Sequence, residues 1–211
     1  MRLFFVLLLV IISNHVLADE KKISSVINLY GVTFQHGTPP WITDVENPFL
    51  EVRPFRNQKG RNFVFELIPR DESFKNWKSI FAVSALKNNR PIAAKIWSDY
   101  SLQALRDACQ SYSEEVLLME KNIALIKVYC PKVVGVPMPG YEGDVGEIGV
   151  FAFLVMDNVL INHHIEWRGS AFDTSNPETW PISVEGIEKG LTELKKAKAI
   201  SSAGMLGFDS E

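Results

Sequence analysis

The chain has 211 residues, of which 46% are hydrophobic and 22% charged, a composition typical of a globular protein of one or two domains. This composition excludes long disorder, a collagen-like repeat and a coiled-coil rod. The formal net charge is −3, from 22 basic and 25 acidic side chains. Because non-specific nucleic-acid binding needs a broad basic surface, we expect no nucleic-acid partner.

Residues 1–18 have the pattern of a secretory signal peptide. A single cation precedes the apolar run Leu3–Ile12, and at ~1.5 Å per residue this run spans only about half of a bilayer's hydrocarbon core. Val16 and Ala18 supply the small residues that signal peptidase requires, which predicts cleavage between Ala18 and Asp19. We therefore expect an exported protein, periplasmic or secreted, whose mature chain has no transmembrane segment.

The two cysteines, Cys109 and Cys130, are predicted to form a structural disulfide. Paired thiols persist as disulfides in an oxidising compartment. The 20 residues between the two cysteines do not match the CxxC spacing of redox and metal pairs. A disulfide leaves no free thiol for cysteine catalysis.

Residues 19–48 are predicted to be an N-terminal extension with one strand, in the apolar run Val26–Phe34. Residues 49–211 are predicted to form a single α+β domain, an antiparallel sheet of about six strands packed against helices. Pro54 suggests that the first strand lies at an edge, and a turn is expected at Asn57–Gly60. The candidate strands are Phe49–Phe55, Asn62–Ile68, Ile80–Leu86, Glu115–Glu120, Ile123–Cys130, Gly149–Met156 and Val159–Arg168.

Two segments have helical periodicity. A helix is predicted from Ser98 to near Tyr112, but the same apolar stripe continues to Met119, so one long helix is an alternative to a helix followed by a hairpin. The β-rich run that follows favours the hairpin, which brings Cys109 within reach of its partner. A last amphipathic helix is predicted over Ser183–Ile200, with an acidic first turn and lysines near its end.

Several segments of the chain together carry a family resemblance. They are FVFELIPRDESFKNWKSIFAVSAL (Phe63–Leu86), Cys109, Cys130-Pro131 and GEIGVFAFLVMDNVLINHHIEWRGSAFD (Gly146–Asp173). In this order they resemble a poorly characterised family of small exported bacterial proteins with a PsbP-like α/β sandwich fold. The resemblance runs from Phe49 to Asp173, and it implies an antiparallel sheet packed against helices. Its motifs, which include Trp77, Gly146-Glu147 and Arg168-Gly169, are structural, so it implies no catalytic residue.

The segment Val159–Arg168 alternates as a strand does. Its period places His163 on an apolar face and His164, Glu166 and Arg168 on the other. We therefore expect His163 to be buried and His164 exposed, and the two histidines cannot chelate one metal. The ladder of His164, Glu166 and Arg168 has two interpretations, a solvated sheet surface or a site for a small anionic or polar ligand.

The other motifs do not indicate a catalytic residue, a metal site or a cofactor. G-x-S-x-G and phosphate-binding glycine loops do not occur. Trp167 stands where an inverted zinc-protease motif has its second histidine, and the acidic loop Gly140–Glu147 lacks EF-hand spacing. Trp41 and Trp180 lie in Pro-containing loops, where a tryptophan either plugs the end of a core or anchors a partner. Both are kept as candidate ligand-binding residues.

These observations favour an exported, non-enzymatic binding or assembly module whose partner is an unidentified protein or envelope component. The alternative is a carboxylate-dependent hydrolase acting outside the cytoplasm, because the spatial pairing of carboxylates is not visible in one sequence. A pocket with two carboxylates ~5–10 Å apart would favour the hydrolase, and a shallow apolar patch would favour the binding module. Trp77 is expected to close the core between the strands at Phe63–Ile68 and Ile80–Leu86.

Overall fold

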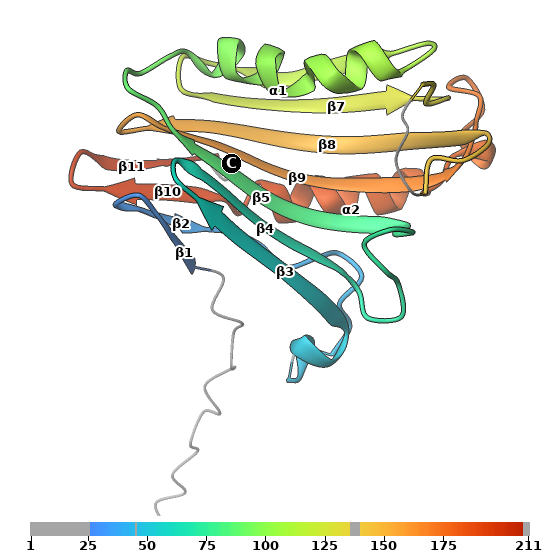
Figure 1. Cartoon of the computed structure of the whole chain (residues 1–211), viewed down its shortest axis with the longest axis horizontal. Helices are drawn as coiled ribbons and strands as arrows, with labels where there is room; N and C mark the ends of the chain where they lie inside the picture. The colour runs from blue at the N-terminus through green and yellow to red at the C-terminus, as the bar shows by residue number, and fades with distance from the viewer. Residues whose placement is uncertain (1–25, 45, 136–139, 209–211) are drawn as a thin grey trace, which may run out of the picture.

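The computed structural model describes residues 26–44, 46–135 and 140–208, and the predicted signal peptide with its Ala18–Asp19 cleavage site lies outside them. Within these residues the fold is α+β, with two antiparallel sheets and two α-helices (Figure 1). The large sheet has the order β3-β4-β5-β9-β8-β7-β6. Its strands are β3 (Val52–Lys59), β4 (Asn62–Pro69), β5 (Ser79–Lys87), β6 (Ser113–Met119), β7 (Ile123–Cys130), β8 (Val145–Met156) and β9 (Val159–Ser170).

The small sheet joins the two ends of the chain. Its order is β1-β2-β10-β11, with β1 (Val26–Leu29), β2 (Val32–Gln35), β10 (Lys198–Ser201) and β11 (Gly204–Gly207). The single strand expected in residues 19–48 is therefore wrong, because Tyr30 and Gly31 both have positive φ and reverse the chain inside the apolar run. β2 pairs with β10, so Phe34 lies opposite Ala199.

Both predicted helices form with shifted ends. α1 (Ala94–Ala108) starts earlier than expected, and α2 (Val184–Leu194) stops earlier. The domain was expected to end in a helix reaching Ile200, and this is wrong, because residues Lys198–Ser201 find strand partners in β2 and β11. Pairing with a distant strand overrides weak helix propensity at a helix end.

The hairpin that the sequence favoured after α1 is confirmed, and the single long helix is not formed. α1 ends at Ala108, and β6 and β7 pair antiparallel, with Ser113 opposite Tyr129. The β8–β9 hairpin turns at Asp157 and Asn158, both of which have positive φ, as a tight hairpin turn requires.

The first strand of the large sheet differs from the prediction. Pro48–Leu50 form a short 3-10 turn, so β3 begins at Val52 rather than Phe49. The turn expected at Asn57–Gly60 is also displaced, since β3 continues to Lys59 and the chain reverses at Gly60. β3 is an edge strand, as Pro54 indicated.

The large sheet is covered on both faces (Figure 1). α1 packs on one face, where Trp97 and Leu102 join the inward side chains of β7 and β8. α2 and the small sheet pack on the other, and there the main core forms around Phe34, Phe81 and Leu191. Gly190 permits close contact, because a Cβ at this position would lie 2.6 Å from Cη2 of Trp167.

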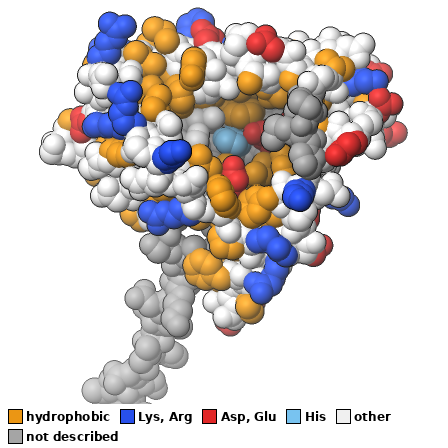
Figure 2. Space-filling view, viewed as in Figure 1, with side chains coloured by type: hydrophobic (Ala, Val, Ile, Leu, Met, Phe, Trp, Pro, Cys, Tyr) orange, Lys and Arg blue, Asp and Glu red, His pale blue; other side chains and the backbone are white. Residues whose placement is uncertain are grey.

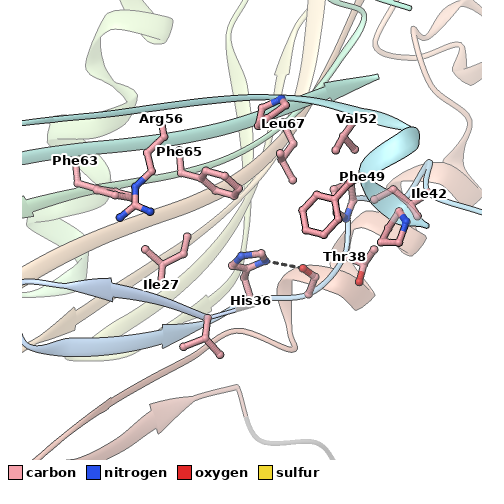
Figure 3. A pocket seen from close by; sticks show the side chains of 15 residues that line it. Ile27, His36, Thr38, Ile42, Phe49, Val52, Arg56, Phe63, Phe65 and Leu67 are labelled. Carbon is pink, nitrogen blue, oxygen red and sulfur yellow. Dashed lines mark hydrogen bonds between the residues drawn. The ribbon is translucent and has the colours of Figure 1, made fainter. Parts of the chain in front are cut away.

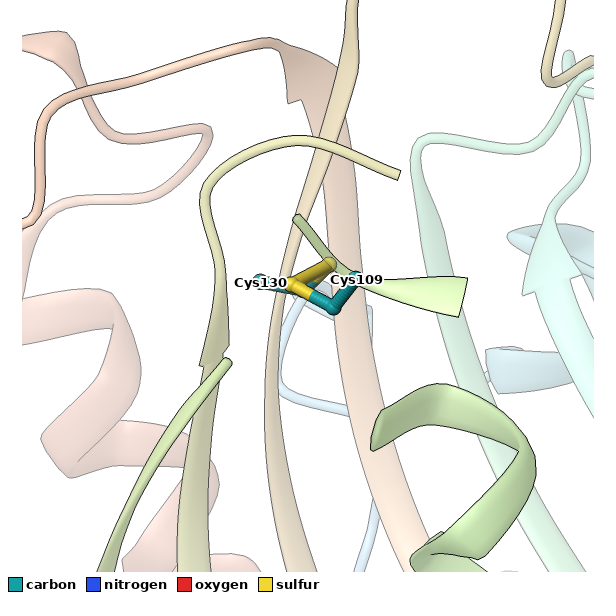
Figure 4. The surroundings of a disulfide bond; sticks show 2 residues. All are labelled: Cys109 and Cys130. Carbon is teal, nitrogen blue, oxygen red and sulfur yellow. A yellow bond between two sulfur atoms is a disulfide. The ribbon is translucent and has the colours of Figure 1, made fainter. Parts of the chain in front are cut away.

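Cys109 and Cys130 are joined by a disulfide (Figure 4). Cys109 directly follows α1 and Cys130 ends β7, with Cα atoms 5.5 Å apart. The bond ties the C-terminal end of α1 to the sheet below it. Among the residues described, no helix has the length and apolar character needed to cross a membrane.

Candidate functional site

A hollow of about 300 Å³ opens on the α1 face of the large sheet. One wall is α1, a second comes from the segment between β7 and β8, and the floor is made by Glu147, Phe151, Asn162, His164 and Glu166. The space-filling view of this face shows a hollow with histidine surface at its floor and acidic surface beside it (Figure 2). We call this feature the α1 hollow.

Strand register brings the floor residues together. In the β8–β9 pair, Phe151 lies opposite His164, Gly149 opposite Glu166, and Glu147 opposite Arg168. Opposite and diagonal positions of a sheet are within contact range. Gly149 leaves room first for the Phe151 ring and then for Glu166, because a Cβ there would lie 2.9 Å from Cζ of Phe151 and 3.1 Å from Cγ of Glu166.

His164 and Glu166 form the polar pair at the centre of the floor. Nε2 of His164 lies 3.2 Å from Oε1 of Glu166, and the imidazole stacks on Phe151 with ring centroids 5.2 Å apart. Burial lowers the pKa of His164 to about 4, so the ring is neutral at neutral pH. Burial, and then repulsion by Glu147 and Glu66, raise the pKa of Glu166 well above its ordinary value, and Arg168 opposes this rise.

Burial disfavours the charged form of both groups, the imidazolium of His164 and the carboxylate of Glu166. Within the part of the chain that the structure describes, Nδ1 of His164 is buried and has no hydrogen-bond partner. The same holds for Asn162 Oδ1 and Ser101 Oγ, which also belong to residues lining the α1 hollow.

Glu147 is the second acid of the α1 hollow. It is 3% exposed, and the Tyr141 hydroxyl donates to its Oε1 at 2.6 Å. Burial raises the pKa of Glu147, while the hydrogen bond from Tyr141 and the charge of Arg168 lower it. Glu66, which shares this face of the sheet through the register of β4, β5 and β9, has its pKa raised by burial as well.

Arg168 lies beside the α1 hollow and is held by aromatic rings. Its guanidinium carbon is 4.3 Å from the ring centroid of Trp77 and 4.8 Å from that of Tyr141. Its Nε donates to the Trp77 carbonyl oxygen at 2.9 Å. Three carboxyls therefore share one face with this stacked cation, whose Nη1 and Nη2 are buried without a hydrogen-bond partner among the described residues.

The structure brings two of the five candidate ligand-binding residues into the α1 hollow. His164 and Glu166 lie on its floor and Arg168 beside it. Trp41 is remote, in a surface depression with Arg70. Trp180 is also separate: its ring lies 5.3 Å from that of Tyr129, and both tryptophans pack against the main core.

The alternation predicted for β9 is confirmed, with one correction. His163 is fully buried, against Phe81 at a centroid distance of 4.7 Å, as expected. His164 was expected to be exposed, and this is wrong: its side chain is 16% exposed. The polar ladder is not a solvated surface, because α1, Val133 and Tyr141 form walls around it.

Sequence reasoning did not select Ser101, Tyr141, Asn162 or Glu66 as site residues, and it treated Glu147 as structural. The available signal was an ionisable or amide side chain within a strand that is otherwise apolar, as at Glu147 in β8. Such a side chain is buried only with partners or for a function. Among the described residues, no three His, Cys, Asp or Glu side chains gather as a metal would require.

No protein-family model and no curated protein matches the chain. Among solved structures, it is similar to the Ran-binding protein Mog1p of Saccharomyces cerevisiae, with a TM-score of 0.48 and 10% identity over 84% of this chain and 96% of that one. A mutant of protein Mog1 matches over the same shares, with a TM-score of 0.46 and 10% identity.

Proposed function

We propose that this protein is an exported, non-enzymatic module that binds a small, neutral, hydrogen-bonding ligand in the α1 hollow. One observation carries the proposal. Ser101, Asn162 and His164 all line this hollow, and their Oγ, Oδ1 and Nδ1 atoms are buried with no partner among the described residues. Leaving a buried polar atom unpaired costs about 1–3 kcal/mol, so three in one place indicate partners supplied by a ligand.

The same atoms define the ligand's chemistry. His164 Nδ1 donates or accepts according to the tautomer of the ring, Asn162 Oδ1 accepts, and the Ser101 hydroxyl can do either. A ligand with both donors and acceptors satisfies all three. Burial disfavours charge on both His164 and Glu166, and a neutral ligand adds no further charge to this buried floor. A volume of 300 Å³ is at the lower end of small-molecule sites, about 300–1,000 Å³, and suits a monosaccharide or a short amide.

The remaining parts of the proposal concern location and architecture. The disulfide suits an oxidising compartment, in agreement with export to the periplasm or beyond after cleavage between Ala18 and Asp19. The two helices and two sheets are compatible with the PsbP-like sandwich that the sequence resembles, and an envelope component remains the proposed partner. N-terminal sequencing of the exported protein tests this part, since a mature chain that begins at Met1 contradicts it.

Asn162 offers the most direct test of the α1 hollow. N-acetylglucosamine, which carries hydroxyls and an amide, serves as the neutral probe, with cationic glucosamine and anionic glucuronate as charged comparisons. We expect Asn162→Leu to lose binding of the neutral probe in NMR titration. The free energy of unfolding of the same variant should be about 1–2 kcal/mol higher than that of the wild type, because the substitution removes an unpaired buried acceptor.

Ser84→Val is the matched control. Ser84 lies opposite Asn162 in the β5–β9 register but does not line the α1 hollow, so its replacement should leave probe binding unchanged. If Asn162→Leu binds as the wild type does, or if glucuronate binds more tightly than the neutral sugar, the proposed ligand chemistry is wrong.

A hydrolase is the second candidate, on the strength of a different observation. Glu147 and Glu166 are diagonal neighbours on β8 and β9, a relation that places Cβ atoms at most ~7–8 Å apart. Both carboxyls have raised pKa values, as general acids do. The tight hydrogen bond from Tyr141 to the buried Glu147 favours binding over catalysis. Turnover of nitrophenyl N-acetylglucosaminide that disappears in both Glu147→Gln and Glu166→Gln would establish the hydrolase.

A further inference from the structure

A second concavity lies far from the polar floor of the α1 hollow, between the two sheets. β3 and β4 face β1 and β2 across a crevice of about 230 Å³, whose lining is predominantly apolar (Figure 3). Ile27, Phe65 and Leu67 belong to this lining. β1 and β3 are edge strands, and the small sheet packs on the large one through β10 and β11 on β8 and through Phe34 of β2 on His163 of β9. The sheets are therefore not joined along these edges, and we call the space between them the edge crevice.

A single cation lies on the apolar side of β3. Arg56 is opposite Phe65 in the β3–β4 register and so shares the face of the edge crevice. Its guanidinium carbon lies 5.3 Å from the ring centroid of Phe63, and Figure 3 shows the side chain reaching down from its strand into the space. In the described part of the chain, Arg56 takes part in no ion pair.

The inner end of the edge crevice carries no charge. His36 follows β2 directly and lines the crevice, and its Nδ1 donates to the Gly37 carbonyl oxygen at 2.7 Å. Burial lowers the pKa of His36, which keeps the ring neutral. A ligand in this space meets apolar walls, a neutral inner end and a positive charge on one wall.

We propose that the edge crevice binds an aliphatic chain that carries an anionic head. The chain lies between Ile27 on one sheet and Phe65 and Leu67 on the other, and the head pairs with Arg56. At about 30 Å³ per water molecule, 230 Å³ holds about eight waters, and a methylene group is nearly as large as a water. An alkyl chain of about eight or nine carbons, the length of the decanoate tail, therefore fits. Phe49, which lines the crevice and is 67% exposed, becomes covered on binding.

Decanoate is the probe, with decanol as the neutral probe of the same chain length. Calorimetric titration of the full mature protein should show saturable binding of decanoate. Arg56→Gln should weaken decanoate binding about tenfold, which corresponds to loss of one charge-assisted hydrogen bond, and should leave decanol binding unchanged. Ile27→Trp, which fills the edge crevice, should abolish binding of both probes.

Arg53→Gln is the matched control. Arg53 is on the same strand but on the opposite face, where its Nη2 donates to the Arg70 carbonyl oxygen. Its replacement should leave decanoate binding unchanged. An equal loss in both arginine variants overturns the proposal, because it indicates only general charge attraction.

Vesicles distinguish a free acid from a lipid as the source of the chain. Arg56-dependent sedimentation with phosphatidylglycerol vesicles, but not with phosphatidylcholine vesicles, supports a membrane lipid, and decanoate binding alone supports a free acid. No binding of either source overturns the proposal. The proposal is also overturned if Arg56→Gln only promotes self-association of the protein. Inward charges on edge strands prevent edge-to-edge pairing, and this would then be the role of Arg56.

Discussion

Replacement of Trp77 tests how the segment between β4 and β5 is held. The indole packs on Ile68, Ile80 and Ala82, a small cluster on the two strands that were expected to flank it. It is half-buried there, separate from the main core. Its ring also receives the guanidinium of Arg168 at 4.3 Å.

The cost of Trp77→Ala follows from these contacts. Truncating a fully buried tryptophan costs about 3–5 kcal/mol, so a half-buried one should cost roughly 2 kcal/mol. Loss of the cation–π contact adds about 0.5–1 kcal/mol. For a chain of this size, each kcal/mol lowers Tm by about 2–4 °C, and we therefore expect a fall of roughly 5–12 °C. The Arg168 Nε bond persists, because its acceptor is the main-chain oxygen of residue 77.

Differential scanning calorimetry of the wild type, Trp77→Ala and Trp77→Leu provides the measurement. Trp77→Leu keeps an apolar side chain on the cluster and loses the cation–π contact, so it should fall between the other two. The reasoning fails if Trp77→Ala melts within about 1 °C of the wild type. It also fails if the alanine variant is stable but no longer binds N-acetylglucosamine, since Trp77 would then belong to a binding site.

Three further predictions concern the disulfide, the histidines and the buried acid. Non-reducing peptide mapping should recover the Cys109–Cys130 linkage, and its reduction should lower the free energy of unfolding by roughly 3 kcal/mol; two free thiols would contradict this. Diethyl pyrocarbonate should modify His164 before His163 in the native protein, because only the former reaches solvent, and equal rates would show that the β9 register is wrong. The raised pKa of Glu166 means that the folded state favours its protonated form, so the wild type loses stability as the pH rises above about 4.3, the ordinary value. Thermal melts should show Glu166→Gln more stable than the wild type at pH 8 and equal at pH 4, and a pH-independent difference would refute the burial argument.

The parts of the fold that the sequence predicted well are governed by local rules. The β8–β9 hairpin follows from alternation and from Asp157 and Asn158, residue types that tolerate positive φ. Tyr30 also has positive φ, and a tyrosine gives no such signal. The apolar run around it was for that reason predicted as one strand. The end of α2 was missed because the strand partner of Ala199 comes from the other end of the chain.

The candidate site shows the same division. Alternation alone placed His164, Glu166 and Arg168 on one face and His163 on the other, and the structure agrees. The period does not reveal what covers a face. The exposed position expected for His164 was wrong because α1, which is distant in the sequence, forms a wall beside it.

By itself, the sequence determined the strand period, most turns and the face of β9 that carries polar groups, because each depends on neighbours a few residues away. It also determined the cysteine pair, because only two cysteines are present. Tertiary structure decided that β2 pairs with β10, that Glu147 and Glu166 meet across a hairpin beside Glu66, and that α1 leaves a hollow over them. The raised pKa values of these acids arise from burial and from one another's charge. Both causes depend on strands that lie side by side in the fold, and a local sequence pattern does not show which strands contact one another.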